Sequence, residues 1–277
     1  MMNITQAINK GRTCLSGSDS PEGDSQYLLC HVLACTSTYL HTWPEKGLSE
    51  QQQADYLTLL EQRVKGRPVA HLIGQRGFWS LDLTVNADTL IPRPDTELLV
   101  TLALEKIQPD MLVADLGTGS GAIALAIASE RVDLHVLAME RSIGALKVAQ
   151  GNAVQCKIEN IAFWRGDWLS AIADNTLDMI VSNPPYITSN DPHLTQGDVR
   201  FEPLAALVSG QDGLDDIRQI VEQARRCLKP KSWLLIEHGF DQAEAVSTLF
   251  KQANFEQVVS AKDYGGNDRV TLGQQPL

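Results

Sequence analysis

The apolar residues in the first part of the chain recur at helical spacing. Between Ser49 and Lys65 they form a stripe with steps of three and four positions, at Tyr56, Leu57, Leu60 and Val64. This is the pattern of an amphipathic helix. Ser49 and Gln52 have the spacing of a capping box, in which each side chain accepts a hydrogen bond from the other residue's backbone amide. The pattern therefore predicts a helix from Ser49 to Lys65.

A second helix is expected over residues 26–40, whose inward-facing positions are Leu29, Val32 and Leu33. No period-two alternation interrupts residues 1–70, although a half-buried strand would require it. We therefore expect residues 1–70 to form a small helical domain.

The pattern changes after this region. Residues 78–85 alternate between apolar and polar side chains, which predicts a strand or a hairpin. The segment Ile91–Glu97 contains two prolines, which favour extended backbone before a helix from about Thr96 to Ile107. We assign residues 71–92 to a β-hairpin and linker between two domains.

From Met111 onward, apolar strand patterns alternate with helical patterns. Strands are expected at 112–116, 134–139, 161–164, 179–182, 234–237, 257–261 and 270–272, and the main helices at 122–130, 143–155, 214–228 and 242–253. This alternation is typical of a mostly parallel sheet covered by helices on both faces. The last two strands are too close in sequence for a crossover helix, so they should pair antiparallel. We predict an α/β fold, a doubly wound, Rossmann-like sheet of seven strands, over residues 93–277.

Composition and charge exclude several classes of protein. The formal net charge is -11, which disfavours a nucleic-acid substrate and is compatible with a basic protein partner. The five cysteines are scattered, so neither a disulfide framework nor a zinc site is expected. The amino terminus lacks a signal peptide, and the longest apolar run, Ala122–Ala128, is too short to cross a bilayer. We expect a cytoplasmic protein without metal or membrane contact.

A glycine-rich turn follows the first strand of the predicted sheet. It consists of Gly117, Thr118, Gly119, Ser120 and Gly121. Glycines at the carboxyl end of a parallel strand let the backbone turn sharply and approach a ligand closely. The spacing is G-x-G-x-G, whereas dinucleotide sites use G-x-G-x-x-G. A plain glycine-rich turn is the alternative interpretation.

Acidic residues follow the next two strands. Glu140 ends the second strand of the sheet, where a carboxylate commonly accepts hydrogen bonds from ribose hydroxyls. A solvated charge at a strand end is the alternative. Asp167 and Trp168 follow the third strand, where an acid can bind an adenine amino group and an aromatic ring can cover the base. Trp168 could equally be a core residue.

The fourth strand of the sheet ends in the most specific motif of the chain, Asn183-Pro184-Pro185-Tyr186. Two prolines fix the backbone and remove two amide donors, which leaves carbonyl groups free to accept from a ligand. The Asn183 side-chain carbonyl and the Pro184 main-chain carbonyl can together accept both hydrogens of an NH2 group. Tyr186 offers a flat face for packing. A strand-ending turn would explain the prolines but not this combination.

These motifs together resemble class I S-adenosylmethionine methyltransferases that act on amide or amine nitrogens. More closely, the chain resembles the peptide-chain release factor glutamine methyltransferases. The resemblance covers nearly the whole chain and is carried by Leu90–Glu97, Ser182–Ile187, Asp191–Leu207, Asp263–Gly265 and Arg269–Leu272, together with the helical region and the strand after Phe78. Glu140 is a departure, because this family usually has aspartate there.

The resemblance implies the roles of the site residues. Gly117–Gly121, Glu140, Trp168 and Asn183 would bind S-adenosylmethionine, which leaves as S-adenosylhomocysteine, and the Asn183–Tyr186 motif would hold the acceptor glutamine. The acceptor is then the glutamine of the Gly-Gly-Gln motif of release factors. We expect the catalytic residues to be Asn183, Pro184 and Tyr186, the helical domain to recognise the protein substrate, and the enzyme to be a monomer.

Three other functions compete with this one. A DNA adenine methyltransferase uses the same chemistry on a flipped base, but the acidic chain lacks a basic recognition domain. A donor-binding module without catalysis would not need the Asn183–Tyr186 motif. An NAD-dependent oxidoreductase is disfavoured by the glycine spacing.

Overall fold

The computed structural model describes residues 2–277, which divide into two compact units. The helical unit contains Met1–Gln75 and, from much later in the chain, His193–Phe201. The sheet unit contains Arg76–Pro192 and Glu202–Leu277. Residues 193–201 are therefore grouped with the helical unit, although the chain on either side of them belongs to the sheet unit.

The helical unit is built from five helices. They are α1 (Ile4–Cys14), α2 (Pro21–Leu33), α3 (Ser37–Thr42), α4 (Glu50–Val64) and α5 (Val69–Ile73). The predicted capping box is confirmed, since Gln52 N donates to Ser49 Oγ and Ser49 N donates to Gln52 Oε1. The unit has its own core, in which Leu28, Leu29 and Tyr56 are fully buried.

The single helix predicted over residues 26–40 is wrong. Helix α2 starts earlier, at Pro21, because a proline at the first helical position already has the required φ and needs no amide partner. It ends at Leu33, because Ala34 adopts the left-handed conformation with φ of 48° and caps the helix. The chain then starts α3 at Ser37.

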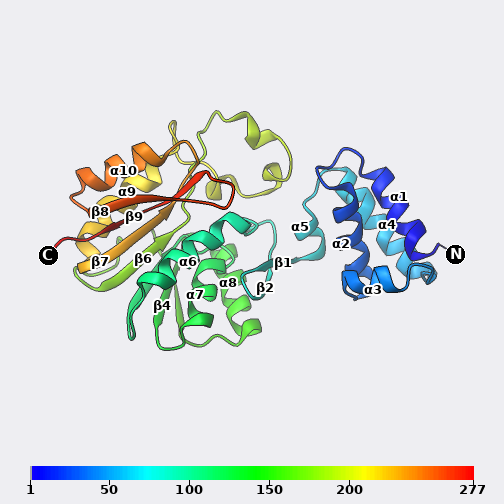
Figure 1. Cartoon of the computed structure of the whole chain (residues 1–277), viewed down its shortest axis with the longest axis horizontal. Coiled ribbons are helices and arrows are strands. Elements are labelled where there is room, and N and C mark those ends of the chain that lie inside the picture. Colours follow the sequence, from blue (N-terminus) through cyan, green and yellow to red (C-terminus); the bar gives the residue numbers. More distant parts are fainter. Residues whose placement is uncertain (1) are drawn as a thin grey trace. The chain divides into compact units, whose positions relative to one another are not determined.

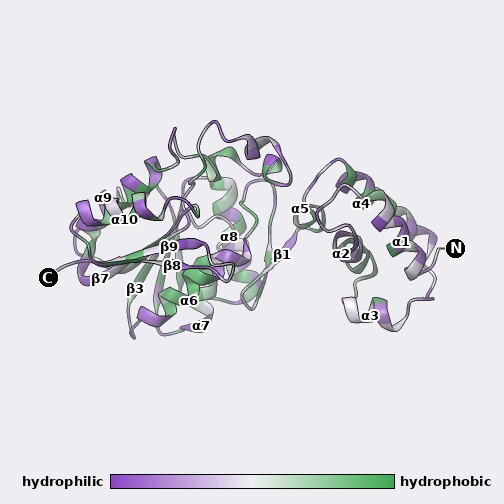
Figure 2. Cartoon of the chain, turned by 45° about the horizontal axis from the view of Figure 1, so that its top comes forward, coloured by the Kyte–Doolittle hydropathy of each residue, from purple (hydrophilic) through white to green (hydrophobic). Residues whose placement is uncertain are grey.

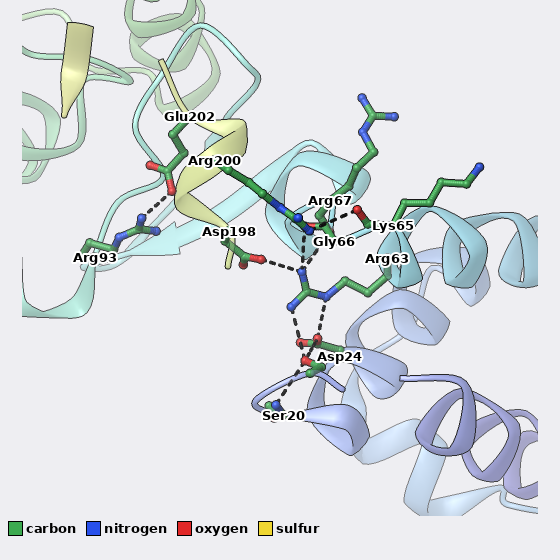
Figure 3. Close-up of polar contacts among 11 residues, drawn as sticks. Ser20, Asp24, Arg63, Lys65, Gly66, Arg67, Arg93, Asp198, Arg200 and Glu202 are labelled. Atoms are coloured by element: carbon green, nitrogen blue, oxygen red, sulfur yellow. Dashed lines mark hydrogen bonds and ion pairs between the residues drawn. The ribbon is translucent and has the colours of Figure 1, made fainter. Parts of the chain in front are cut away.

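Arg63 attaches the late segment to the helices of its unit. Its Nε donates to Asp24 Oδ2 at 2.7 Å and its Nη1 donates to Asp198 Oδ1 at 2.6 Å (Figure 3). Arg200 Nη2 donates to the Lys65 carbonyl at 3.3 Å. The side chain of Arg63 is only 12 % exposed, so this cation is paired at a largely desolvated position.

The sheet unit contains the predicted seven-stranded sheet. Its strands are β3 (Leu112–Leu116), β4 (His135–Glu140), β5 (Ile161–Arg165), β6 (Leu177–Ser182), β7 (Leu228–Glu237), β8 (Glu256–Lys262) and β9 (Asp268–Gln274). Their order is β5-β4-β3-β6-β7-β9-β8, and β9 is antiparallel to both β7 and β8. The antiparallel pairing predicted for the last two strands is confirmed.

The alternating segment at residues 78–85 is a hairpin. Strands β1 (Gln75–Phe78) and β2 (Leu81–Thr84) form a separate two-stranded sheet. They are joined through Trp79 and Ser80, and Trp79 has a positive φ of 57°. The buried side chains of Phe78 and Leu83 attach the hairpin to the core of the sheet unit.

Helices cover both faces of the large sheet. Helices α6 (Glu97–Lys106), α7 (Ala122–Glu130) and α8 (Ile143–Cys156) pack on one face, and α9 (Asp215–Cys227) and α10 (Ala243–Gln252) on the other (Figure 1). Short 3-10 turns occur at Pro94–Thr96, Pro192–Thr195, Val199–Phe201 and Leu204–Ala206. The green colouring of α6 in Figure 2 agrees with the burial of Leu99, Val100 and Ala103.

The strand order defines the position of a ligand crevice. The chain passes from β3 to β4 and β5 on one side, then returns to the other side of β3 with β6. Ligands of such sheets bind beyond the carboxyl ends of the strands at this switch point. No helix within residues 2–277 combines the length and the apolar character needed to span a membrane.

Candidate functional site

The glycine turn after β3 has the backbone conformation that glycine allows. Gly117, Gly119 and Gly121 have φ values of 72°, 58° and 88°, in the left-handed region that other residues rarely adopt. The amides of Gly117 and Thr118 both donate to the Met139 carbonyl, at 3.0 and 2.9 Å. A Cβ on Gly121 would lie 2.9 Å from Leu125 Cδ1. The turn is thus fixed against the end of β4.

The buried side chain of Asp115 is hydrogen-bonded to this turn and to the helix that follows it. It accepts hydrogen bonds from Thr118 Oγ1 at 2.6 Å and from Ala124 N at 3.2 Å. Burial raises the pKa of its carboxyl to about 7, and the nearby Glu140 charge contributes in the same direction. The sequence gives no indication of this role for Asp115, because a single acid inside an apolar strand has no distinctive spacing.

Glu140 connects the ends of the glycine turn and helix α8. Its Oε2 accepts from Gly119 N at 3.0 Å, and its Oε1 accepts from Ser142 N at 2.8 Å. Each carboxylate oxygen can accept more than one hydrogen bond. The carboxylate is therefore oriented by the backbone and can still accept from ligand hydroxyl groups.

A cavity of about 260 Å³ opens at the carboxyl ends of the strands. Seven residues singled out from the sequence line it: Gly117, Gly119, Glu140, Asp167, Trp168, Asn183 and Pro185. Thr118, Ser120, Gly121, Pro184 and Tyr186 do not line it, and the first three shape or support the turn. The structure thus brings residues of the glycine turn, the residues that follow β4 and β5, and half of the Asn183–Tyr186 motif to one cavity.

Trp168 is a core residue that also faces the cavity. It is 8 % exposed and belongs to a hydrophobic core cluster, and it also lines the cavity. Its ring lies over the glycine turn so closely that a Cβ on Gly117 would be 3.3 Å from Trp168 Cζ3. A flat apolar wall beside the Glu140 carboxylate suits a ligand made of a planar base and a ribose.

The Asn183–Tyr186 motif begins directly after β6. Ser182 Oγ donates to the Leu116 carbonyl at 2.8 Å, which ties the end of β6 to that of β3. Asn183 Nδ2 donates to Thr96 Oγ1 at 3.2 Å. Gln242 Nε2 donates to the Tyr186 carbonyl at 3.0 Å. The motif is therefore held at both ends by hydrogen bonds from outside it.

Tyr186 packs against the hydrophobic cluster beneath α9 and α10. Burial and the neighbouring Glu237 charge raise the pKa of its phenol to about 12. The phenol is accordingly neutral at physiological pH and cannot serve as a base there.

Two further segments, which no local motif revealed, also line the cavity. They are residues 87–90 and, from a later segment, Pro203, Ala205 and Ala206. The buried Glu202 accepts from Ile91 N at 3.2 Å and from Arg93 Nη2 at 2.5 Å, which joins the two segments (Figure 3). Leu90 and the residues from Pro203 onward belong to segments that carry the family resemblance, which was the signal that could have identified them; no such signal pointed to residues 87–89.

The lining fits S-adenosylmethionine. The carboxylates of the cavity lining, the Trp168 ring and the glycine turn offer the groups that a nucleoside-bearing sulfonium requires. In the described part of the chain, His, Cys, Asp and Glu nowhere form a group of three or more able to hold a metal ion.

Comparisons with known proteins agree with this geometry. The profile of the family described as "PrmC N-terminal domain" matches residues 6–74, and that of "Methyltransferase small domain" matches residues 94–198. The release factor glutamine methyltransferase of Vibrio cholerae is 51% identical over 263 residues, covering 94% of this chain and 91% of the relative. That of Escherichia coli is 49% identical over 261 residues, with 94% of each chain covered.

The solved structures support the fold. A methyltransferase from Pyrococcus furiosus aligns with a TM-score of 0.56 at 14% identity, over 78% of this chain and 98% of that one. The fold, the cavity for a methyl donor and the extent of the sequence identity lead to one assignment. The chain belongs to the S-adenosylmethionine-dependent release factor glutamine methyltransferases.

Proposed function

We propose that this protein transfers the methyl group of S-adenosylmethionine to the side-chain amide nitrogen of the glutamine in the Gly-Gly-Gln motif of a release factor. The observation that carries the proposal is the orientation of Asn183. Its amide nitrogen donates to Thr96 Oγ1, so the carbonyl Oδ1 remains available for the NH2 of an acceptor. The Pro184 carbonyl is the second acceptor of that group.

This pair of acceptors addresses the difficulty of the reaction. An amide nitrogen is a poor nucleophile because its lone pair is delocalised into the carbonyl. As the carbon–nitrogen bond forms and the methyl–sulfur bond breaks, positive charge develops on the nitrogen. Asn183 Oδ1 and the Pro184 carbonyl stabilise that charge, a preorganised electrostatic effect. The methylated nitrogen then becomes acidic and loses its proton to solvent, so no strong base is required.

The donor would be held by residues of the same cavity. We assign the ribose hydroxyls to Glu140, the adenine to Asp167 and Trp168, and the close approach of the backbone to Gly117–Gly121. Bound there, S-adenosylmethionine supplies an electrophilic methyl group on a sulfonium sulfur. Asn183 and Pro185 line this cavity, so the acceptor and the donor would meet at Asn183.

The recognition of a protein substrate is assigned to the helical unit. It has its own core and includes His193–Phe201, a segment that leaves the sheet unit a few residues after Tyr186. The net charge of -11 favours a basic partner by long-range attraction. We place the enzyme in the cytoplasm, as a monomer that contacts neither nucleic acid nor membrane.

The acceptor is tested with labelled donor and three substrates. They are a release factor, the same factor with its Gly-Gly-Gln glutamine replaced by glutamate, and duplex DNA. We expect methyl incorporation only into the unaltered factor. Incorporation into DNA would favour an adenine methyltransferase, and undiminished incorporation into the glutamate variant would exclude the proposed acceptor.

A further inference from the structure

Glu237 ends strand β7 at the carboxyl edge of the sheet. Strands β6 and β7 run parallel with Ser182 opposite Ile236, so the next residues along the two strands are Asn183 and Glu237. Glu237 is 1 % exposed. Its Oε2 atom has no hydrogen-bond partner within residues 2–277. Burying a carboxylate with an unpaired oxygen costs free energy. This cost points to a role for Glu237 at the adjacent site.

Thr96 and Asn183 are the polar neighbours of the Glu237 carboxylate. As potential hydrogen-bond donors to it, both favour its ionised form. Asn183 Nδ2 donates to Thr96 Oγ1 at 3.2 Å. One hydrogen of the Asn183 amide is thus directed at Thr96, and the Glu237 carboxylate is the acceptor near the amide for the other. Thr96 is itself buried, with 4 % of its surface exposed, so water does not compete for these bonds.

We infer that Glu237 is a positioning residue for methyl transfer, which orients the Asn183 amide so that Oδ1 faces the acceptor nitrogen and which strengthens that oxygen as an acceptor. The inference rests on the proposed function of Asn183. Glu237 acts through Asn183 and does not touch the substrate.

The chemistry of an amide explains the need for such a residue. The oxygen and nitrogen of an asparagine amide have nearly the same shape, so packing alone does not decide between two orientations. In the wrong orientation, an NH2 group would meet the NH2 group of the acceptor. An ionised carboxylate only accepts hydrogen bonds, so Glu237 excludes that orientation. Donation to an anion also draws electron density toward Oδ1.

The ionisation state of Glu237 controls this effect. Burial raises the pKa of its carboxyl to about 7, against hydrogen bonds from Thr96 and Asn183 and the charge of Arg269, while Asp95 adds to the rise. Below this pH the protonated carboxyl can itself donate, so it no longer enforces one orientation. We therefore expect kcat to fall as the pH drops through about 7.

The titration of Glu237 can be distinguished from that of the other ionisable groups near it. The pKa of Tyr186 is raised to about 12 and that of His238 is lowered by burial, and Glu237→Gln retains both groups. The pKa of Asp115 is also raised to about 7, but Asp115 supports the glycine turn. Its titration should change donor affinity, and saturating donor removes that contribution from kcat.

The kinetic test uses Glu237→Gln, which keeps the size of the side chain and removes the charge. At pH 8 and saturating donor we expect kcat to fall about tenfold to hundredfold. The KM for the release factor and the Kd for the donor should change less than about twofold, and the fall in kcat near pH 7 should be lost. Asp178→Asn is the matched control, because Asp178 pairs with Lys229 and Leu112 N at the opposite end of β6. It should retain wild-type kcat.

A second measurement needs no acceptor. In the donor-free protein, the side-chain amide resonance of Asn183 should titrate with a midpoint near pH 7 and should not titrate in Glu237→Gln. Thr96→Ser should retain kcat and Thr96→Val should lower it. Wild-type kcat in Glu237→Gln, or an Asn183 resonance that titrates equally in both proteins, would overturn the inference. Absence of release factor methylation by the wild-type enzyme would instead refute the proposed function, and the Asn183 resonance would still decide the role of Glu237.

Discussion

Gly119 and Glu140 are joined by a hydrogen bond of 3.0 Å from the Gly119 amide to Glu140 Oε2. The bond ties the glycine turn after β3 to the end of β4, while the other carboxylate oxygen accepts from Ser142 N. Glu140 therefore has a structural role in addition to the donor-binding role proposed for it. Its extra methylene, relative to the usual aspartate, still allows both backbone contacts.

Glu140→Ala should weaken donor binding by about 2–4 kcal/mol, because charge-assisted hydrogen bonds of about 1.5–3 kcal/mol each are lost and partly replaced by water. Calorimetric titration with donor measures the change. Glu159→Ala is the control, since Glu159 is an exposed acid just before β5, at the opposite edge of the sheet. Unchanged donor affinity in Glu140→Ala would remove Glu140 from the site.

Asn183→Ala should lower kcat by about 10²–10³-fold, the range found when one group that stabilises a transition state is removed. Most of the donor affinity should survive, because the contribution of Asn183 is strongest once charge develops on the acceptor nitrogen. Single-turnover kinetics at saturating donor separates the two effects. Near-normal turnover would mean that another group holds the acceptor.

The two acidic partners of Arg63 should differ in their effect on the helical unit. The Asp24 side chain is 14% exposed and that of Asp198 is 41% exposed. Asp24→Ala should cost about 1.5–3 kcal/mol, as for a hydrogen-bonded charge out of water, and Asp198→Ala about 0–1 kcal/mol. Urea unfolding measures both. Hydrogen exchange should show faster opening of residues 193–201 in the Asp198 variant, and equal costs would contradict this difference in burial.

The stability of the protein should depend on pH through Glu237. The pKa of an unfolded glutamate is about 4.3, and burial raises that of Glu237 to about 7 in the folded protein. The folded state therefore binds the extra proton. This stabilisation is fully present below about pH 4 and is lost as the pH rises to about 7.

Glu237→Gln has no such proton to lose. The free energy of unfolding of this variant, relative to wild type, should therefore increase between pH 5 and pH 8. Urea unfolding of the two proteins across this range measures the difference, and the contribution of Asp115 cancels because both contain it. A relative stability that is independent of pH would contradict the raised pKa.

Much of the sheet unit could be predicted because its signals are local. The glycine turn, the acid at the end of β4 and the Asn183–Tyr186 motif each follow an apolar strand, and parallel strands bring their carboxyl ends together. The capping box of Ser49 and Gln52 is equally local. These features are properties of short stretches of sequence, so the sequence alone was sufficient.

The parts that were missed depend on tertiary contacts. Ala34 interrupts a continuous helical pattern through a left-handed φ of 48°. Because alanine favours helix, its presence in the sequence does not indicate that conformation. Thr96 and Glu237 approach Asn183 from different elements, the 3-10 turn Pro94–Thr96 and strand β7. No spacing in the sequence relates these three residues, so their arrangement emerges only from the register of the sheet and the packing beside it.

The most direct measurement concerns the methylated atom. A release factor is incubated with the enzyme and S-adenosylmethionine, and its peptides are sequenced by tandem mass spectrometry. We predict one added methyl group, on the side-chain nitrogen of the glutamine in the Gly-Gly-Gln motif, formed about 10²–10³-fold more slowly when the enzyme carries Asn183→Ala. A methyl group on any other residue, or an unmodified glutamine after incubation with active enzyme, would contradict the proposed function.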